Sequence, residues 1–251
     1  MPGRAKLNLD LAVVARTHDG FHEVRTRMQA IALHDLLELA RAESTTMTTS
    51  GSHAIDPTNN SVLEAHKSMQ DATGTELPTK FHLIKRIPPG SGMGGASSDA
   101  AAAIRGLVAI HDLKATADLD LAKIAASVGA DVPFFLIGGA AQAEGRGDRL
   151  VPLPKETAWF AIAWPEIELS TAAVYRAWDE VQGDGANELT RAACHVDQRI
   201  QEFATRLGSK WQMTGSGSAF FQRFHDQKAA HEASANLDCW TAVTQAVGAW
   251  S

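Results

Sequence analysis

Residues 88–99 read Pro-Pro-Gly-Ser-Gly-Met-Gly-Gly-Ala-Ser-Ser-Asp, and an alanine-rich apolar stretch, residues 100–110, follows them. Glycines let the main chain approach an anion without a Cβ in the way. The unpaired N–H groups and the dipole of a helix that starts after such a turn favour negative charge. Because residues 81–87 precede the loop with the pattern of a strand, the segment predicts a strand, a glycine-rich turn and a helix that bind the phosphates of a nucleotide.

Two other kinds of glycine-rich loop fit this segment poorly. A Walker A loop carries Lys and Ser/Thr after its last glycine, whereas Gly95 is followed by Ala-Ser-Ser. Gly90, Gly92 and Gly95 match the dinucleotide-binding spacing, but two prolines separate them from the strand, and residues 119–128 have helical spacing where a second parallel strand is needed. The cation that meets the phosphates must therefore come from elsewhere in the chain.

Composition limits the class of protein. The chain has 251 residues and a formal net charge of -6, which gives no general attraction to nucleic acid, so local lysines and main-chain amides must meet anionic substrates. Its two cysteines form no disulfide framework and fit a reducing cytoplasm. Asp10 interrupts the early apolar segment and Arg105 breaks the longest alanine-rich run, so we expect neither a signal peptide nor a membrane span. We expect a cytoplasmic protein without a membrane or nucleic-acid partner.

The hydrophobic pattern predicts a mixture of strands and helices. Leu7, Leu9, Leu11 and Val13 alternate along one predicted strand, which places Lys6 and Asn8 together on its other face. Further strands are expected twice within 28–39, then at 81–87, 159–164, 211–214 and 219–224, and helices after Asn60, at 100–110, 171–180, 199–207 and 227–235. A turn is expected at 18–20 and an exposed loop or hairpin at 44–52, and Ser97, Ser98 or Asp99 is expected to cap the helix after the glycines. This order favours an α+β protein, and the polar residues 152–156 suggest domains 1–155 and 156–251.

Several further segments carry a resemblance to a known family. They are Ala-Lys-Leu-Asn-Leu at 5–9, Asp-Gly-Phe-His-Glu at 19–23, Gly-Ala-Asp-Val-Pro-Phe-Phe at 129–135 and Thr-Gly-Ser-Gly-Ser at 214–218. With the glycine-rich loop, they resemble the motifs of the GHMP kinases in sequence and in order. The resemblance implies a two-lobed fold with the active site between the lobes, and ATP as co-substrate with Mg²⁺ carried on it. The set is most similar to the branch that phosphorylates a hydroxyl of a cytidine-diphosphate-linked methylerythritol in non-mevalonate isoprenoid biosynthesis.

The same resemblance assigns the catalytic and ATP-binding residues. Alone, Asp131 reads as a turn carboxylate that caps its own backbone, and Lys6 as a solvated strand lysine. By resemblance, Asp131 is the catalytic base and Lys6 supplies the cation that the glycine loop lacks. The residues expected at ATP are Pro89, Gly90, Ser91, Gly92, Met93, Gly94, Gly95, Ala96, Ser97 and Ser98, with Asn60 and Lys85 on the adenosine side. No protein metal-ligand set is expected, and Asp99 is expected to cap the helix or point away from the phosphates.

Six residues are expected at the second substrate, again by resemblance. They are Asn8, Phe21, His22, Tyr175, Gly215 and Ser216. Phe21 and Tyr175 would sandwich the cytosine while His22 reads its edge. Phe21 stands where the family has tyrosine, so any hydrogen bond made by that hydroxyl is lost in this chain. Gly215 and Ser216 would close over the substrate phosphates from the second lobe.

Two alternatives stay open at this point. Met93 replaces a leucine of the family's loop, residues 187–189 match a family motif only in part, and the second lobe is short. One alternative is a GHMP kinase acting on homoserine or a mevalonate-like alcohol, which would not need the cytosine-reading motif. The other is a catalytically silent nucleotide-binding protein, in which Lys6 and Asp131 would have no use. The sequence does not fix the oligomeric state.

Overall fold

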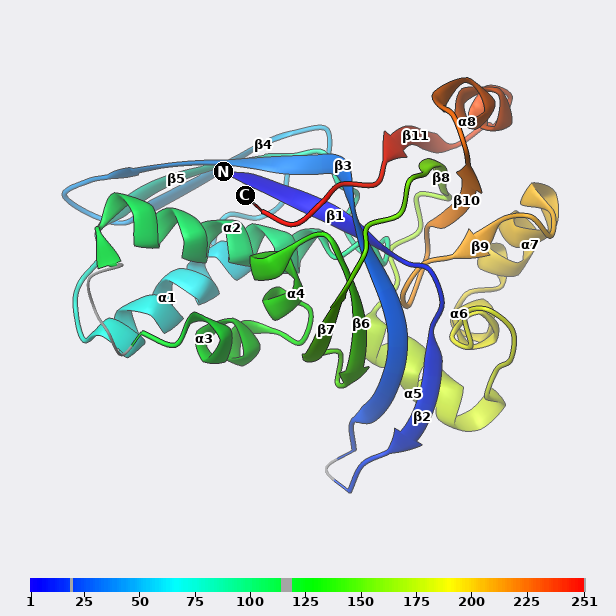
Figure 1. The fold of residues 1–251 in the computed structure, drawn as a ribbon, viewed down its shortest axis with the longest axis horizontal. Coiled ribbons are helices and arrows are strands. Elements are labelled where there is room, and N and C mark those ends of the chain that lie inside the picture. The colour runs from blue at the N-terminus through cyan, green and yellow to red at the C-terminus, as the bar shows by residue number, and fades with distance from the viewer. Residues whose placement is uncertain (19, 114–118, 251) are drawn as a thin grey trace.

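The computed structural model describes residues 1–18, 20–113 and 119–250 and folds them into two β-sheets flanked by helices (Figure 1). The strands are β1 (Pro2–Asn8), β2 (Ala12–Arg16), β3 (His22–Arg41), β4 (Thr46–Gly51), β5 (Thr79–Lys85), β6 (Ala140–Gly145), β7 (Arg149–Leu153), β8 (Trp159–Trp164), β9 (Gln212–Met213), β10 (Phe220–Phe224) and β11 (Trp240–Gln245). The helices are α1 (Ser61–Thr73), α2 (Gly95–Ile110), α3 (Leu121–Val128), α4 (Val132–Ile137), α5 (Thr171–Val181), α6 (Thr190–Val196), α7 (Gln198–Leu207) and α8 (Gln227–Ser234).

The long strand β3 organises the first sheet, which has the order β4-β5-β3-β6-β7 with β1 and β2 also paired to β3. Strands β1 and β2 lie one after the other along one edge of β3, and each is antiparallel to it. On the other edge, β6 pairs with residues 24–29 and β5 with residues 36–41. The edge between those two stretches is covered by the returning end of the chain, where Ala246 bridges Ile31 and the Val247 amide donates to the Ala30 carbonyl at 2.9 Å.

Helices α1 to α4 form the first core with this sheet (Figure 1). Helix α2 lies across β1 and β3, and its run of four alanines, residues 100–103, is completely buried. Small side chains let the helix approach the sheet closely. A Cβ added at Gly106 would lie 2.6 Å from the side chain of Leu39, so any larger residue would force Leu39 to shift. The sequence of α2 thereby fixes where its N-terminus, and the loop before it, must lie.

The second sheet is antiparallel, in the order β11-β8-β10-β9, and residues 154–158 connect it to the first. Its strands β8 and β10 bury Phe160, Ile162 and Phe221 against β1 and Ile31. Helices α5, α6 and α7 share another core with Leu11, Val13 and Val24 of the first sheet. Because apolar side chains from both halves pack together, the division into domains at residue 155 stays a proposal based on the two separate sheets.

Most of the predicted elements are confirmed, as is the α+β class. The strand at 159–164, the paired strands β9 and β10 and the helices at 171–180, 199–207 and 227–235 all exist within a few residues of the predicted bounds. Asn60 caps α1, because its side-chain oxygen accepts a hydrogen bond from the Val62 amide at 2.8 Å. The predicted turn at 18–20 centres on Asp19, which lies outside the described residues.

Four local predictions are wrong for identifiable reasons. The strand predicted through Val13 ends at Asn8 and resumes at Ala12. Residues 28–39 form part of one strand because 22–41 contain no glycine or proline to turn the chain. The Thr-rich segment predicted as a loop or hairpin forms β4, parallel to β5, as β-branched residues favour. Helix α2 begins at Gly95 with Gly94 at the N-cap, so Ser97, Ser98 and Asp99 lie inside its first turns rather than capping it.

A tryptophan clamps the returning chain end to the first sheet. The Trp250 ring lies between two guanidinium groups, with Arg4 Cζ 3.8 Å and Arg105 Cζ 3.9 Å from its centroid. Its Nε1 donates to the Phe135 carbonyl of α4 at 2.8 Å, and Arg105 donates to the same carbonyl at 2.6 Å. Burial, with a smaller contribution from Arg4, lowers the pKa of Arg105 to about 10. The clamp thus joins β1, α2 and α4 to the chain end.

Trp250→Ala is expected to lower the free energy of unfolding by about 2–4 kcal/mol. It removes two cation–π contacts, worth roughly 0.5–2 kcal/mol each, and a hydrogen bond worth about 1 kcal/mol. In a chain of this size the melting temperature should fall by roughly 5–15 °C. Trp250→Phe is the matched control, because it keeps an aromatic face and loses only the Nε1 hydrogen bond. An alanine variant that melts with the wild type would contradict the clamp.

Candidate active site

One cavity, of about 1130 Å³, brings most of the predicted site residues together from both sheets. Its lining includes Lys6, Asn8, Phe21, His22, Lys85, Pro89, Gly90, Ser91, Gly92, Gly94, Gly95, Ala96, Ser97, Asp131, Tyr175, Gly215 and Ser216. Three predicted residues lie outside it. Met93 is buried in the core between the sheets, Ser98 points back to the Gly95 carbonyl at 2.8 Å, and Asn60 is used as the cap of α1.

Lys6 is a buried cation in the lining of this cavity. Its ammonium contacts the Asn8 side-chain oxygen, donates to the Gly92 carbonyl at 2.9 Å and lies 3.7 Å from Asp131 Oδ2. Desolvation lowers the pKa of Lys6, and Asp131 partly opposes that shift. Lys6 and Asn8 do share one face of β1 as predicted, but both are buried because the loop after β9 covers them, where Thr214 Oγ1 accepts a hydrogen bond from the Asn8 amide at 2.9 Å.

Asp131 is presented to the cavity by the turn between α3 and α4. It occupies the N-cap position of α4, yet its carboxylate makes no capping hydrogen bond. The side chain is 34% exposed and pairs with Lys6 instead. A carboxylate of this kind, beside a buried ammonium and open to a cavity, is available to accept a proton from a bound hydroxyl.

The glycine-rich loop lines the cavity and gives two of its carbonyls to the second half of the chain. The Gly90 carbonyl accepts from Leu169 and Ser218, both at 3.3 Å, and the Ser91 carbonyl accepts from the Ala219 amide at 3.0 Å. Within the described chain, no acceptor is found for the amides of residues 95–97 in the first turn of α2. Three free amides at a helix N-terminus beside a cavity form an anion site.

The glycines of the loop are required by the second lobe as well as by a ligand. Gly92 has φ +78°, and a Cβ there would lie 2.3 Å from the Thr214 carbonyl oxygen. Asn187 holds that second loop in place by donating to the carbonyls of Met213 at 2.8 Å and Gly215 at 2.9 Å. The partly matching segment at 187–189 therefore has a structural role in closing the site.

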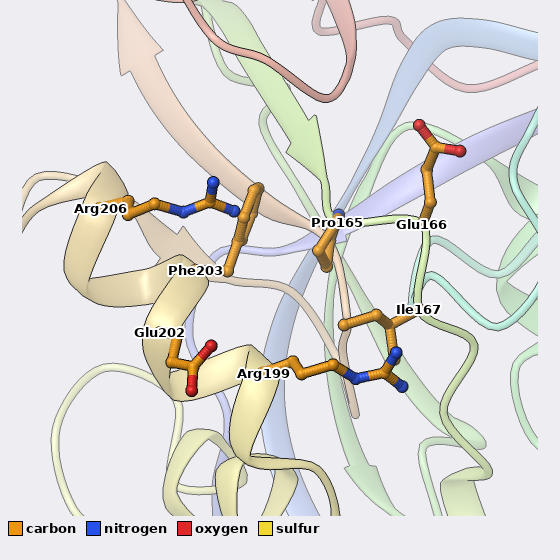
Figure 2. A pocket seen from close by; sticks show the side chains of 7 residues that line it. All are labelled: Pro165, Glu166, Ile167, Arg199, Glu202, Phe203 and Arg206. Atoms are coloured by element: carbon orange, nitrogen blue, oxygen red, sulfur yellow. The ribbon is translucent and has the colours of Figure 1, made fainter.

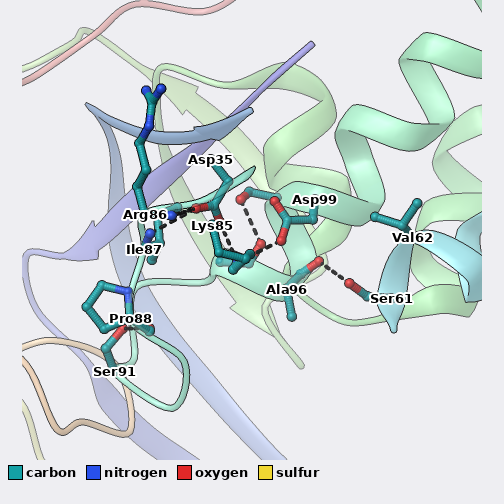
Figure 3. Close-up of polar contacts among 12 residues, drawn as sticks. Asp35, Ser61, Val62, Lys85, Arg86, Ile87, Pro88, Ser91, Ala96 and Asp99 are labelled. Carbon is teal, nitrogen blue, oxygen red and sulfur yellow. Dashed lines mark hydrogen bonds and ion pairs between the residues drawn. The ribbon is translucent and has the colours of Figure 1, made fainter. Parts of the chain in front are cut away.

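A buried ion-pair cluster lies beneath the start of α2 (Figure 3). The Lys85 ammonium contacts Asp35 and lies 2.8 Å from Asp99 Oδ2, and Asp35 also accepts from the amides of Arg86 at 2.5 Å and Ile87 at 2.8 Å. Lys85 is thus a paired, buried group and no surface charge. No pattern in the sequence pointed to Asp35, which comes from the middle of β3, far from the loop in the chain.

The cluster holds a proton at neutral pH. Burial raises the pKa of Asp99 from its ordinary value of 3.8 to about 8, with Lys85 opposing the shift and Asp35 adding to it. Burial also opposes the charge of Lys85, but Asp99 and Asp35 outweigh it and raise the Lys85 pKa. The raised pKa of Asp99 reduces the negative charge of the cluster, so it repels an anion above it less than two ionised carboxylates would.

The aromatic wall of the cavity comes from the start of β3 and from α5. His22 stacks on Tyr175 with ring centroids 5.0 Å apart and an interplanar angle of 24°. Phe21 is 53% exposed, and the Arg146 guanidinium lies 3.8 Å from its ring centroid. Two charged residues, Arg16 and Asp179, line the same wall and were missed by the sequence analysis. The spacing of Asp179 four residues after Tyr175 places both on one face of a helix and was the signal available.

A second hollow, of about 460 Å³, lies away from this site, between α7 and the residues after β8 (Figure 2). Its lining residues are Pro165, Glu166, Ile167, Arg199, Glu202, Phe203 and Arg206. Arg199 is engaged by Asp197 at 2.5 Å. The hollow contains none of the predicted site residues and no glycine-rich loop, so we place the chemistry in the larger cavity.

Two further observations concern metals and membranes. Among residues 1–18, 20–113 and 119–250, no group of three or more His, Cys, Asp or Glu side chains is arranged to hold a metal ion. Over the same residues, no helix combines the length and the apolar character that a bilayer-spanning segment needs.

Comparison with known proteins gives consistent matches. Residues 60–139 match the model of the GHMP kinases N terminal domain. A 4-diphosphocytidyl-2-C-methyl-D-erythritol kinase of Shewanella loihica is 34% identical over 94% of this chain and 88% of the relative. The enzyme of that name from Caldicellulosiruptor bescii is 31% identical over 93% and 92% of the two chains. A crystal structure of 4-(cytidine 5'-diphospho)-2C-methyl-D-erythritol kinase superposes with a TM-score of 0.78 at 30% identity, covering 98% of each chain. The expected GHMP-kinase fold is confirmed.

Replacing Asp99 with asparagine should flatten part of the pH dependence of stability. Between pH 3.8 and about pH 8 the folded protein keeps the Asp99 proton, whereas the unfolded chain loses it. The stabilisation that this carboxyl provides is therefore complete below pH 3.8 and is lost as the pH rises towards about 8. The raised pKa of Lys85 contributes stability that is fully present below pH 10.5, so this contribution is constant across the same pH range. An asparagine side chain does not titrate, so the stability of the Asp99→Asn variant relative to the wild type should rise between about pH 5 and pH 8.

The measurement is the free energy of unfolding by denaturant across that pH range. Asp71→Asn is the matched control, because Asp71 is an exposed acidic residue of α1. Parallel pH profiles for the wild type and the Asp99 variant would show that Asp99 is ionised in the folded protein.

Proposed function

Because the chain belongs to the 4-diphosphocytidyl-2-C-methyl-D-erythritol kinase family of GHMP kinases, we propose that it transfers the terminal phosphoryl group of ATP to a hydroxyl of the cytidine-diphosphate-linked methylerythritol. This reaction would serve non-mevalonate isoprenoid precursor biosynthesis. The observation that carries the proposal is the Lys6–Asp131 pair, which faces the same cavity as the free amides of α2 and the aromatic wall. Free thiols at Cys194 and Cys239 are consistent with work in a reducing cytoplasm.

The first turn of α2 would bind the ATP phosphates. Phosphoryl transfer requires mainly alignment and charge compensation from the protein. The amides of residues 95–97 and the helix dipole supply partial positive charge, and Lys6 supplies a full one. Lys85 adds little net positive charge because its ammonium is already paired with Asp35 and Asp99. Asn60 and Met93 would not contact ATP, since neither lines the cavity. Asn60 would fix the start of α1 and Met93 would anchor the loop in the core.

Mg²⁺ fits this site as an ion that ATP brings with it. The cavity offers hard oxygen donors, the Ser97 hydroxyl and the Asp131 carboxylate, but no dedicated cage among the residues that the structure describes. When bound, the ion would neutralise charge on the transferred phosphoryl group. Ser97 would hold it from the loop side.

Lys6 and Asp131 would prepare the acceptor alcohol. Lys6 has Asn8 and the Gly92 carbonyl as fixed partners, so its ammonium is held in place between the loop and the carboxylate. Asp131 would accept the hydroxyl proton as the oxygen attacks phosphorus. The 3.7 Å separation of Lys6 Nζ and Asp131 Oδ2 leaves the carboxylate free to rotate towards a substrate oxygen.

The aromatic wall would hold the cytidine end of the substrate. Phe21, His22 and Tyr175 line the cavity. Gly215 and Ser216, which belong to the second lobe, line it as well. Ser216 and Thr171 share a hydrogen bond of 3.0 Å that joins the second loop to the start of α5. Closure around the diphosphate would therefore be coupled to the helix that carries Tyr175.

The proposal is tested by incubating the protein with ATP, Mg²⁺ and a panel of alcohols. The panel is the cytidine-diphosphate-linked methylerythritol, homoserine and mevalonate, with ADP release and ³¹P NMR of the product as readouts. Turnover of the first alcohol alone supports the proposal. Preferential turnover of homoserine or mevalonate, or ATP binding without turnover of any alcohol, would refute it.

Asp131→Asn is expected to reduce kcat by about 10²- to 10⁴-fold and to leave both KM values nearly unchanged, because the amide keeps the shape and loses the proton acceptor. Asp120→Asn is the control, since Asp120 caps α3 through its side-chain oxygen and Asn caps a helix equally well. Near-normal kcat in the Asp131 variant would make it a structural turn residue.

A further inference from the structure

His22 is fixed on three sides, with one polar atom left over. Its Nε2 lies 2.7 Å from Asp179 Oδ1, its ring stacks on Tyr175, and the Trp178 ring meets it edge-on at 5.7 Å. The side chain is only 7% exposed, although the residue lines the large cavity. In the part of the chain that the structure describes, Nδ1 has no hydrogen-bond partner. This nitrogen is therefore the atom that His22 offers to a ligand.

Asp179 determines which nitrogen of His22 carries the proton. Its second oxygen, Oδ2, forms an ion pair with Arg16 at 3.4 Å. An ionised carboxylate can only accept hydrogen bonds, so the 2.7 Å contact requires a hydrogen on Nε2. A neutral imidazole has only one N–H group. Nδ1 is then left with a lone pair and acts as an acceptor.

An acceptor at this position selects between pyrimidine bases. Cytosine carries a 4-amino group that donates hydrogen bonds, whereas uracil carries a 4-oxo group that only accepts. Two acceptors facing each other leave both unpaired, which is the strongest way in which a site rejects a close analogue. We propose that Asp179 is a positioning residue that fixes His22 as an acceptor for the 4-amino group, and so makes the site select cytidine over uridine. The inference rests on the proposed function, because it assumes that the base lies on this wall.

The test measures the affinities of CDP and UDP by calorimetry, without any turnover. The wild type should bind CDP at least about tenfold more tightly than UDP, the value of one matched hydrogen bond. In Asp179→Asn, Arg16 pairs with the amide oxygen, so the amide nitrogen faces Nε2 and donates to it, the ring proton moves to Nδ1, and His22 becomes a donor towards the base. The CDP-to-UDP ratio should then fall by about tenfold and approach or cross unity.

Two further variants separate positioning from a merely structural role. Asp179→Glu keeps a carboxylate and should restore most of the ratio. Glu180→Gln, the neighbouring exposed acid of α5, should leave it unchanged. Loss of affinity for CDP and UDP alike in Asp179→Asn, with the ratio retained, would overturn the proposal, because a general loosening of the wall weakens both ligands together.

¹⁵N NMR of the histidine side chains gives an independent readout. The wild type should show His22 protonated at Nε2, and Asp179→Asn should show it protonated at Nδ1. Nδ1–H in the wild-type protein would overturn the inference whatever the binding data show. If the wild type binds CDP selectively with the Nε2–H form but phosphorylates no cytidine-linked alcohol, the proposed reaction fails while the role of Asp179 stands.

Discussion

The site depends on one buried ammonium group. Lys6 comes from the first strand, yet its contacts reach the glycine-rich loop through the Gly92 carbonyl and the turn between α3 and α4 through Asp131. A buried amine of this kind is costly unless it is hydrogen-bonded and paired, so the three partners must be assembled around it. Its lowered pKa reports that cost, with desolvation as the leading cause. The position of the loop relative to the carboxylate follows from the need to satisfy this one charge.

The second constraint is that both lobes must be present for the loop to hold its shape. The loop gives the carbonyls of Gly90 and Ser91 to the chain around residues 169 and 218–219, while its residues line the cavity. The buried cluster of Lys85, Asp35 and Asp99 lies beneath the start of α2, and its ammonium is already paired with carboxylates. The proposed phosphate binding therefore relies on amides and on Lys6, in a protein whose net charge is -6.

Local patterns were enough to predict the loop, its helix and the side-by-side placement of Lys6 and Asn8. They failed where distant segments decide the outcome. β3 is one strand because it lacks glycine and proline and because four partners and the chain end line its edges, and no window of the sequence reveals those partners. Asp35 and Asp179 were missed for the same reason, since each gains its role only from a contact made across the fold. The roles of Asp131 and His22 came from resemblance to a family; spacing alone favoured a turn carboxylate and a structural ring.

The central claim, that Lys6 and Asp131 act as one unit, is tested most directly by a double-mutant cycle on kcat/KM for the cytidine-linked alcohol. The two single variants are Lys6→Met and Asp131→Asn. If the pair works together, the double variant should be scarcely slower than the worse single variant, because the second change removes an interaction that is already lost. Losses that multiply across the cycle would show that the two groups act independently and would contradict the account.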